Sequence, residues 1–304
     1  MAPASPLSTQ VSVRNMQVVD DVCRSAFGCG GIDLAAVAIV AFLGLLAVLV
    51  VATIVHVSEA SSIVEEELAR IAAERDAFDD FSRRVATIEV PETATAMPAG
   101  GGLATVTGGT LDDRLDSVRT AYRDTVMDVD HYDADYGEPL PENLAAELGD
   151  GLAYAVVDGQ QFTPQLKAAL LEASQEASRR RSSFLTTLEA EAESLAEGAD
   201  AIESIGREQE SIAAAPLSQR SWDALVGDWN RLGSLVDRCR ASARARQERT
   251  RSLSAGLSSE RPDLHEYLYD GLPVSHPVLA DVAALSETIE TRRSQVLQAL
   301  TRRV

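Results

Sequence analysis

The chain has 304 residues, enough for one or two domains with a sizeable core. Its 47 acidic residues outnumber its 27 basic residues, so the formal net charge is -20 and a chain-wide affinity for nucleic acid is excluded. Three cysteines are too few for a closed disulfide framework.

The basic residues are divided very unevenly between the two types. Lys167 is the only lysine, which leaves 26 arginines. A surface rich in carboxylates and poor in lysine suits molar salt, where charge keeps a protein soluble and ions screen its self-repulsion. We therefore predict a halophilic source. A GC-rich genome, which favours Arg, Ala, Gly and Asp codons, is the alternative explanation of the same bias.

An apolar run follows an N-terminal segment, residues 1–31, that we expect to be flexible. Residues 34–55 form a charge-free stretch of 22 residues, long enough to cross the hydrocarbon core of a bilayer. A secretory signal peptide fits less well, because its apolar region is only about 7 to 15 residues long. The sequence thus predicts a transmembrane helix over residues 32–57, which would bind the lipid bilayer. The arginines near its two ends balance, so they do not decide its orientation.

Residues 58–90 carry an amphipathic helical pattern, and a predicted linker follows it. Apolar residues recur there at steps of three, four or seven, on Val64, Leu68, Ile71, Phe78, Phe81, Val85 and Ile88. This stripe can meet a second copy as a coiled coil, which would make a homo-oligomer, or it can fold back on the body. Residues 91–110, rich in Gly, Pro and Thr and without periodicity, are typical of a flexible linker.

Residues 111–304 are predicted to form a helical bundle. Thr110 is a candidate N-cap for a first helix, and Thr163 with Pro164 is a candidate start for a long one. Further helices are expected after Pro216 and after Pro277. Their apolar residues have coiled-coil spacing, as in Leu188, Leu195 and Ile202, and in Leu225, Trp229, Leu232, Val236, Cys239 and Ala243. Because no run of residues favours a strand, we expect an all-α fold, an elongated antiparallel bundle behind the transmembrane helix.

Acids crowd residues 128–138, a density that suggests a divalent cation site. The spacing does not fit an EF-hand starting at Asp128, because Tyr132 and Asp133 then occupy the fifth and sixth positions. We therefore expect a solvated acidic turn without a metal. His265 and His276 lie in a short connection rich in Tyr, where packing explains them, and an acid–base or metal site would need partners from elsewhere in the fold.

A basic stretch stands out on this acidic chain. Its members are Arg238, Arg240, Arg244, Arg246, Arg249 and Arg251. One interpretation is contact with an anionic partner such as lipid headgroups or nucleic acid. The other is pairing within the bundle with the acid-rich helix that carries Glu189, Glu191, Glu193, Glu197, Asp200 and Glu203. We expect no specific nucleic acid partner.

Four segments together resemble a haloarchaeal family of uncharacterised helical proteins of unknown function. They are AAERDAFDDFSRRV, AYRDTVMDVDHYDADYGEPLPENLAAELG, FTPQLKAALLEA and YLYDGLPVSHPVLADVAAL. The resemblance runs from about Ala60 to the C-terminus and implies a haloarchaeal source. It brings no activity, cofactor or site residue. Some similar proteins lack the membrane helix and any export signal, which implies a body on the cytoplasmic side.

No motif in the sequence indicates a catalytic residue, a cofactor or a metal. We therefore predict a non-enzymatic scaffold or interaction protein, tethered by one span to the cell membrane and engaging an unidentified protein partner. The first alternative is a signalling accessory that transmits a change through the helix of residues 58–90. The second is a metal-dependent enzyme, which would require His131, His265 or His276 to meet carboxylates in one cleft.

Overall fold

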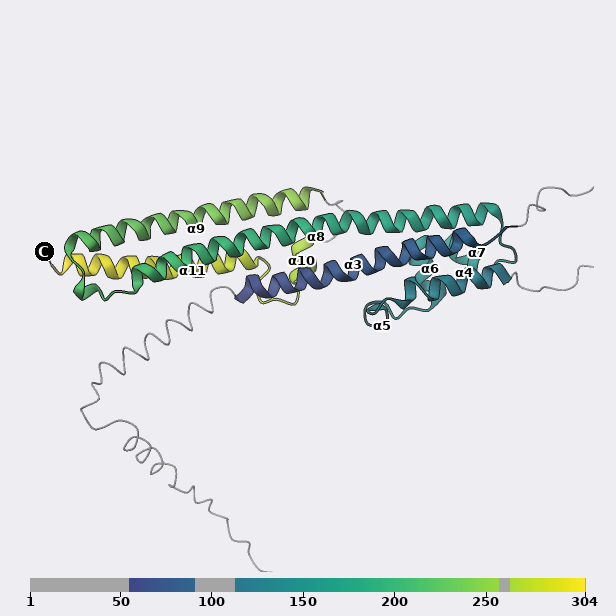
Figure 1. The fold of residues 1–304 in the computed structure, drawn as a ribbon, viewed down its shortest axis with the longest axis horizontal. Helices are drawn as coiled ribbons and strands as arrows, with labels where there is room; N and C mark the ends of the chain where they lie inside the picture. The colour runs from purple at the N-terminus through teal and green to yellow at the C-terminus, as the bar shows by residue number, and fades with distance from the viewer. Residues whose placement is uncertain (1–54, 91–112, 257–262, 304) are drawn as a thin grey trace, which may run out of the picture. The chain divides into compact units, whose positions relative to one another are not determined.

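The computed structural model describes residues 55–90, 113–256 and 263–303, and every regular element in these ranges is a helix. Figure 1 labels the helices by which we name them. The expected all-α body is thus confirmed for the described residues. The predicted flexible segment 1–31 and linker 91–110 lie outside them.

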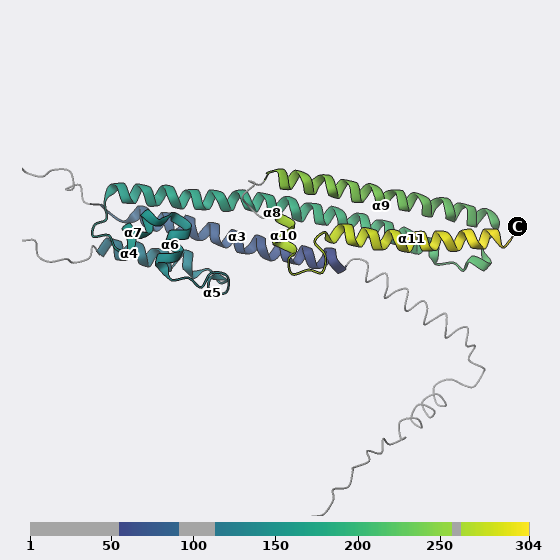
Figure 2. The same cartoon turned by 180° about the vertical axis from the view of Figure 1, so that it is seen from behind.

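The first half of helix α8 (Pro164–Ala213) carries one of two hydrophobic cores. There it packs against the C-terminal part of α3 (Val55–Thr87). Four short helices complete this half, α4 (Asp113–Arg123), α5 (Tyr132–Asp135), α6 (Leu140–Leu148) and α7 (Asp150–Val157), with a 3₁₀ turn η3 (Val126–Asp128). Figures 1 and 2 show them gathered along one end of α3 and α8. Phe81 and Tyr122 meet edge-to-face in this core, with their ring centroids 5.1 Å apart.

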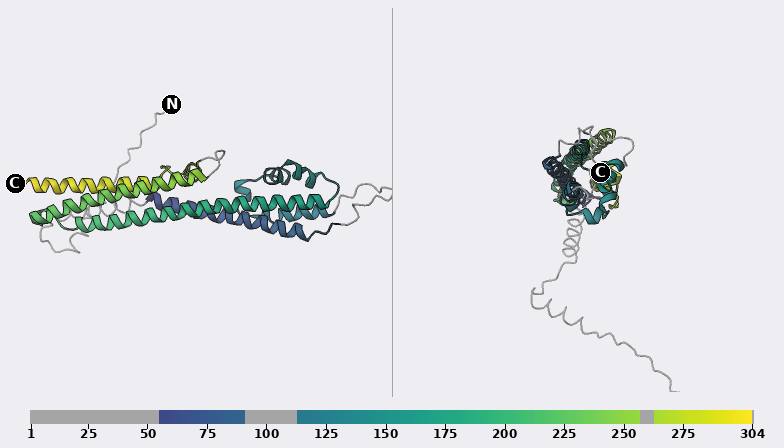
Figure 3. Two further views of the ribbon diagram at one scale, coloured as in Figure 1. Left: turned by 90° about the horizontal axis from the view of Figure 1, so that it is seen from above. Right: turned by 90° about the vertical axis from the view of Figure 1, so that its right-hand side faces the viewer.

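The second half of α8 packs with α9 (Trp222–Gly256) and α11 (Pro277–Thr301) around the other core. The 3₁₀ turn η4 (Leu217–Gln219) connects α8 to α9, and α10 (Leu264–Tyr269) precedes α11. Figure 3 shows α9 and α11 lying beside this half of α8. The predicted heptad positions Leu188, Leu195 and Ile202 are all buried here, as are Leu225, Leu232 and Cys239 of α9.

The N-caps of two helices follow from the local sequence. The Thr163 side chain accepts a hydrogen bond of 3.1 Å from the backbone N–H of Leu166, and Pro164 occupies the first turn of α8. Asp263 caps α10 in the same way, accepting from the backbone N–H of His265. The start predicted for α8 is therefore confirmed.

Helix α3 is held at both ends by residues distant in sequence. Near its first residue, Asp281 of α11 accepts a hydrogen bond of 3.0 Å from the backbone N–H of Val57, while its other oxygen lies 2.7 Å from His56 Nδ1. At the other end, Lys167 donates to the carbonyl oxygens of Ala86 and Ile88. A carboxylate near the N-terminus and an ammonium group at the C-terminus both complement the helix dipole.

The apolar stripe of α3 packs within the same chain. Val64, Phe78, Phe81 and Val85 are buried against α8 and its neighbours. The sequence left open whether this stripe forms a coiled coil with a second copy or folds back on the body, and in the structure it folds back on the body.

The predicted single-pass membrane protein requires correction. Among residues 55–90, 113–256 and 263–303, no helix is long and apolar enough to cross a bilayer. The physical reason is that α3 and the other long helices bury only a stripe and carry charged residues on their remaining faces. Of the predicted span 32–57, residues 32–54 lie outside the described part of the chain, and Val57 at its end is buried against Asp281. The assignments of a transmembrane helix and of a cell-membrane location are withdrawn.

Candidate functional site

A buried ion pair joins α8 to α9. Arg246 Nη2 lies 2.5 Å from Glu191 Oε1, and Arg246 Nη1 donates to Glu191 Oε2 at 3.0 Å and to Ser194 Oγ at 2.6 Å. The Glu191 side chain is fully buried and that of Arg246 is 5 % exposed. Glu191 points inward because it follows Leu188 by three positions and precedes Leu195 by four, so all three share one face of α8.

Helix α10 adds a histidine and a tyrosine to this pair. The Tyr269 hydroxyl donates to Glu191 Oε1 at 2.5 Å. His265 Nε2 lies 3.2 Å from Arg246 Nη2 and 3.5 Å from Glu191 Oε1, and the imidazole is 1 % exposed. We call Glu191, Arg246, His265 and Tyr269 the first buried cluster.

The first buried cluster strongly favours the charged form of its carboxylate. Burial acts to raise the pKa of Glu191, but hydrogen bonds from His265, Arg246 and Tyr269, together with the charge of Arg246, lower it to about 2. Burial and the neighbouring Glu191 carboxylate raise the pKa of Tyr269. A carboxylate with so low a pKa is a weak proton acceptor at neutral pH, so the arrangement suits a structural ion pair better than a general base.

The other half of the body contains a second cluster of the same residue types. Arg181 of α8 donates from Nε to Glu74 Oε2 at 2.7 Å and forms a two-point ion pair with Glu147. Tyr136 donates to Glu74 Oε1 at 2.9 Å, and His131 Nε2 lies 3.0 Å from the same oxygen. We call Glu74, Arg181, Glu147, His131 and Tyr136 the second buried cluster, after its buried carboxylate Glu74; Tyr136 lies at its edge and is 39 % exposed.

In this second cluster the pKa of Glu74 is lowered. Burial opposes the shift, but the charge and hydrogen bonds of Arg181 and the contacts from His131 and Tyr136 outweigh it. The cavity between Glu74, Glu147 and Arg181 has a volume of about 10 Å³, close to that of one water molecule measured in the same way. Because His131 and Tyr136 contact Glu74 of α3, and Glu74 pairs with Arg181 of α8, the cluster joins the segment of residues 126–138 to α3 and α8.

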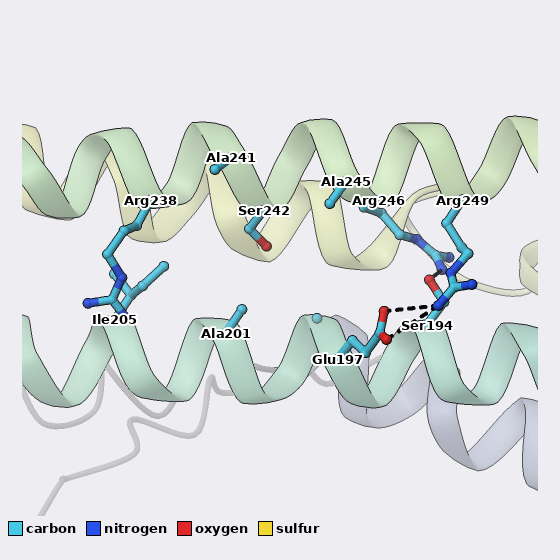
Figure 4. Close-up of a pocket in the computed structure, with 11 residues that line it drawn as sticks. Ser194, Glu197, Ala201, Ile205, Arg238, Ala241, Ser242, Ala245, Arg246 and Arg249 are labelled. Atoms are coloured by element: carbon cyan, nitrogen blue, oxygen red, sulfur yellow. Dashed lines mark hydrogen bonds and ion pairs between the residues drawn. The ribbon is translucent and has the colours of Figure 1, made fainter.

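An open groove of about 390 Å³ runs between α8 and α9, and Arg246 of the first buried cluster lines it. Figure 4 shows Arg238 toward one end and Arg249 toward the other. Small residues lie between them, Gly198 and Ala201 from α8 and Ala241, Ser242 and Ala245 from α9, with Ile205 beside Arg238. The groove thus combines a floor of small residues with arginines at both ends.

The six arginines of the basic stretch are placed differently from one another. Arg246 is in the core with Glu191, whereas Arg238 pairs with Glu208 at 2.6 Å and Arg249 with Glu197 at 3.3 Å on the surface. Arg240 pairs with Asp237. Arg244 and Arg251 are exposed and form no ion pair with the described residues. Pairing with the acid-rich helix, one of the two interpretations, is therefore observed for Arg246 and Arg249.

The histidines do not gather in one place. His131 and His265 belong to different buried clusters, His56 contacts Asp281, and the exposed His276 lies beside His265 with ring centroids 5.7 Å apart. Within the described ranges, no group of three or more His, Cys, Asp and Glu could hold a metal ion. In the acidic segment, the carboxylates of residues 128, 130, 133 and 135 are exposed.

Sequence reasoning did not recognise the polar residues that form the clusters. Glu191 was seen only as one acid among many, although its position between Leu188 and Leu195 places it on the buried stripe. Arg246 lies seven positions after Cys239 and continues the stripe of α9. A charged residue on an apolar heptad position is the signal that could have revealed the pair.

Comparison with known proteins places this chain in a family. The family model described as Domain of unknown function (DUF7260) matches residues 55–293, so the chain belongs to this family. No curated protein and no solved structure matches it. The expected membership of an uncharacterised helical family is thus confirmed, while the haloarchaeal and halophilic source stays a prediction.

Proposed function

We propose that this protein is a non-enzymatic interaction module whose docking surface is the groove between α8 and α9. The observation that carries the proposal is the pair of exposed arginines, Arg238 and Arg249, at the two ends of a groove with a floor of small residues. Charged rims around less polar centres are common at protein–protein interfaces, and arginine is enriched there.

The contacts that these two arginines make within the chain are exchangeable. Arg238 pairs with Glu208 and Arg249 with Glu197, and all four side chains are at least 40 % exposed. Surface ion pairs contribute at most about 1 kcal/mol each, so a partner carboxylate can replace the internal one at little cost. By contrast, both terminal nitrogens of Arg246 contact Glu191 in the core, so this arginine is a fixed part of the groove lining.

The chemistry of the buried clusters supports the non-enzymatic part of the proposal. Glu191 and Glu74 each accept hydrogen bonds from an arginine and a tyrosine, and the cavity beside Glu74 admits no more than about one water. Groups engaged in this way hold helices together and are poorly placed to meet a substrate.

The test is photo-crosslinking in the native host from a photoreactive residue substituted for Ser242, which lines the groove. The wild-type background is compared with R238E/R249E and with the matched control R244E/R251E. The control changes the charge of α9 by the same amount but alters residues that do not line the groove. Circular dichroism melting checks that each variant folds.

We expect a defined protein to crosslink in the wild-type background and in the control, and to be lost in R238E/R249E. A crosslinked protein that both double variants lose equally, or that neither loses, would contradict docking through the groove. The absence of any crosslinked protein in the native host would also count against the proposal.

A further inference from the structure

The two groove arginines share one face of α9. Arg238 and Arg249 are eleven positions apart, and at 3.6 residues per turn eleven positions are just over three full turns. Their Cα atoms are therefore separated by about 16 Å along the helix axis, and their side chains project from the helix in nearly the same direction. Figure 4 shows both side chains reaching toward α8 across the groove.

The floor between the two arginines favours a helical occupant. Gly198 and Ala201 of α8 and Ala241 and Ala245 of α9 have no polar side-chain atom, and Ser194 already contacts Arg246, so beside the Ser242 hydroxyl the floor offers little hydrogen bonding to an incoming backbone. An extended segment lying there would lose water from N–H and C=O groups without gaining partners. A helix satisfies these groups internally and presents only side chains to the floor, where small residues permit close packing.

The acids beside the groove limit how much negative charge an occupant can carry. Glu197 lines the groove itself, and Glu193 lies 3.9 Å from Arg249. A polyanion with charge along its whole length, such as a nucleic acid backbone, would meet these carboxylates. An occupant with one carboxylate for each arginine and uncharged residues between them avoids this repulsion.

We infer that the occupant of the groove is an amphipathic helix of a partner protein, with two carboxylates eleven positions apart and small or apolar residues between them. This inference rests on the proposed function and specifies the chemistry of the partner. The partner's two carboxylates pair with N–H groups of Arg238 and Arg249 that the contacts with Glu208 and Glu197 leave available.

The experiment uses the full chain and three synthetic helical peptides of about 18 residues built on an alanine–glutamine host. The first peptide has two Glu residues eleven positions apart, on one face, and the second has them nine positions apart, on opposite faces, with identical composition. The third has two Lys residues eleven positions apart. Each peptide is titrated by fluorescence anisotropy at low ionic strength against the wild type, R238E/R249E and R244E/R251E.

We expect the wild type and R244E/R251E to bind the first peptide about fivefold more tightly than the second, because only the first can reach both arginines at once and so forms one additional surface ion pair. The variant R238E/R249E should lose this preference and bind the third peptide instead. Equal binding of the first two peptides by the wild type, or no binding of either, would overturn the inference.

This result is separable from the test of the proposed function. If crosslinking in the host identifies a partner that depends on Arg238 and Arg249, but the peptides show no preference, the interaction module stands and the helical occupant is wrong. If the spacing preference appears in the peptides but no partner crosslinks in the host, the groove has the binding preference that we infer, but the proposed function is wrong.

Discussion

Arg246 of α9 and Glu191 of α8 form a two-point ion pair, with nitrogen–oxygen distances of 2.5 and 3.0 Å, in the core between the two helices. Removing one member of a buried pair leaves an uncompensated charge, whereas removing both leaves neither charge of the pair in the core. The pair therefore makes the association of α8 with α9 dependent on both residues at once.

Replacing Arg246 by methionine should lower the free energy of unfolding by about 3 to 5 kcal/mol, because Glu191 is left buried without its charge partner. The measurement is urea denaturation followed by circular dichroism. In the matched control, R249M should cost less than about 1 kcal/mol, since the Arg249 side chain is 42 % exposed and its ion pair with Glu197 lies at the surface. A double variant E191M/R246M that is no more stable than R246M would contradict the ion-pair explanation.

The stability of the protein should fall as the solution is acidified through the range set by Glu191. Its folded-state pKa of about 2 is below its ordinary value of 4.5, so its contribution is fully present above about pH 4.5 and is lost as the pH falls toward 2. The shift corresponds to about 3 kcal/mol. Urea denaturation at a series of pH values should show a shallower dependence for E191Q, and equal slopes would refute the assignment.

Substituting Gly198 by alanine should destabilise the contact between α8 and α11. A Cβ atom at Gly198 would lie 2.8 Å from Val278 Cγ1, so the two helices must separate, at a cost of about 1 to 3 kcal/mol. The control is G206A in the same helix, where no atom lies within 4 Å and alanine should stabilise by about 0.5 to 1 kcal/mol. Thermal denaturation distinguishes them, and the double variant G198A/V278A should recover part of the loss.

Removing the hydroxyl of Tyr136 should loosen the segment of residues 126–138 without unfolding the body. The hydroxyl donates to Glu74 Oε1 at 2.9 Å, and a hydrogen bond to a charged group contributes about 1.5 to 3 kcal/mol. Hydrogen exchange should therefore speed up at least about tenfold in this segment of Y136F and stay unchanged in α9. Tyr154, which is 69 % exposed, supplies the control Y154F, and equal exchange in the two variants would argue against this docking contact.

Local pattern was sufficient to predict the helices of the body. The stripe from Leu225 to Cys239 and the cap at Thr163 depend on spacing within one helix, so both could be recognised without knowing the fold. The prediction of a span over residues 32–57 used only the length of a charge-free run, and among the described residues no helix is long and apolar enough to cross a bilayer. The described helix α3, Val55–Thr87, joins the bundle through Asp281.

The all-α class, the apolar faces of the helices and the excess of acids follow from the order of the residues alone, since they depend on periodicity and composition. Which charged residues are buried depends on contacts across long sequence separations. Glu191 and Arg246 are 55 residues apart, and Glu74 and Arg181 are 107 residues apart. Only the packing of α3, α9 and α10 on α8 brings them together, because a charge becomes stable in a core only when another helix supplies its partner.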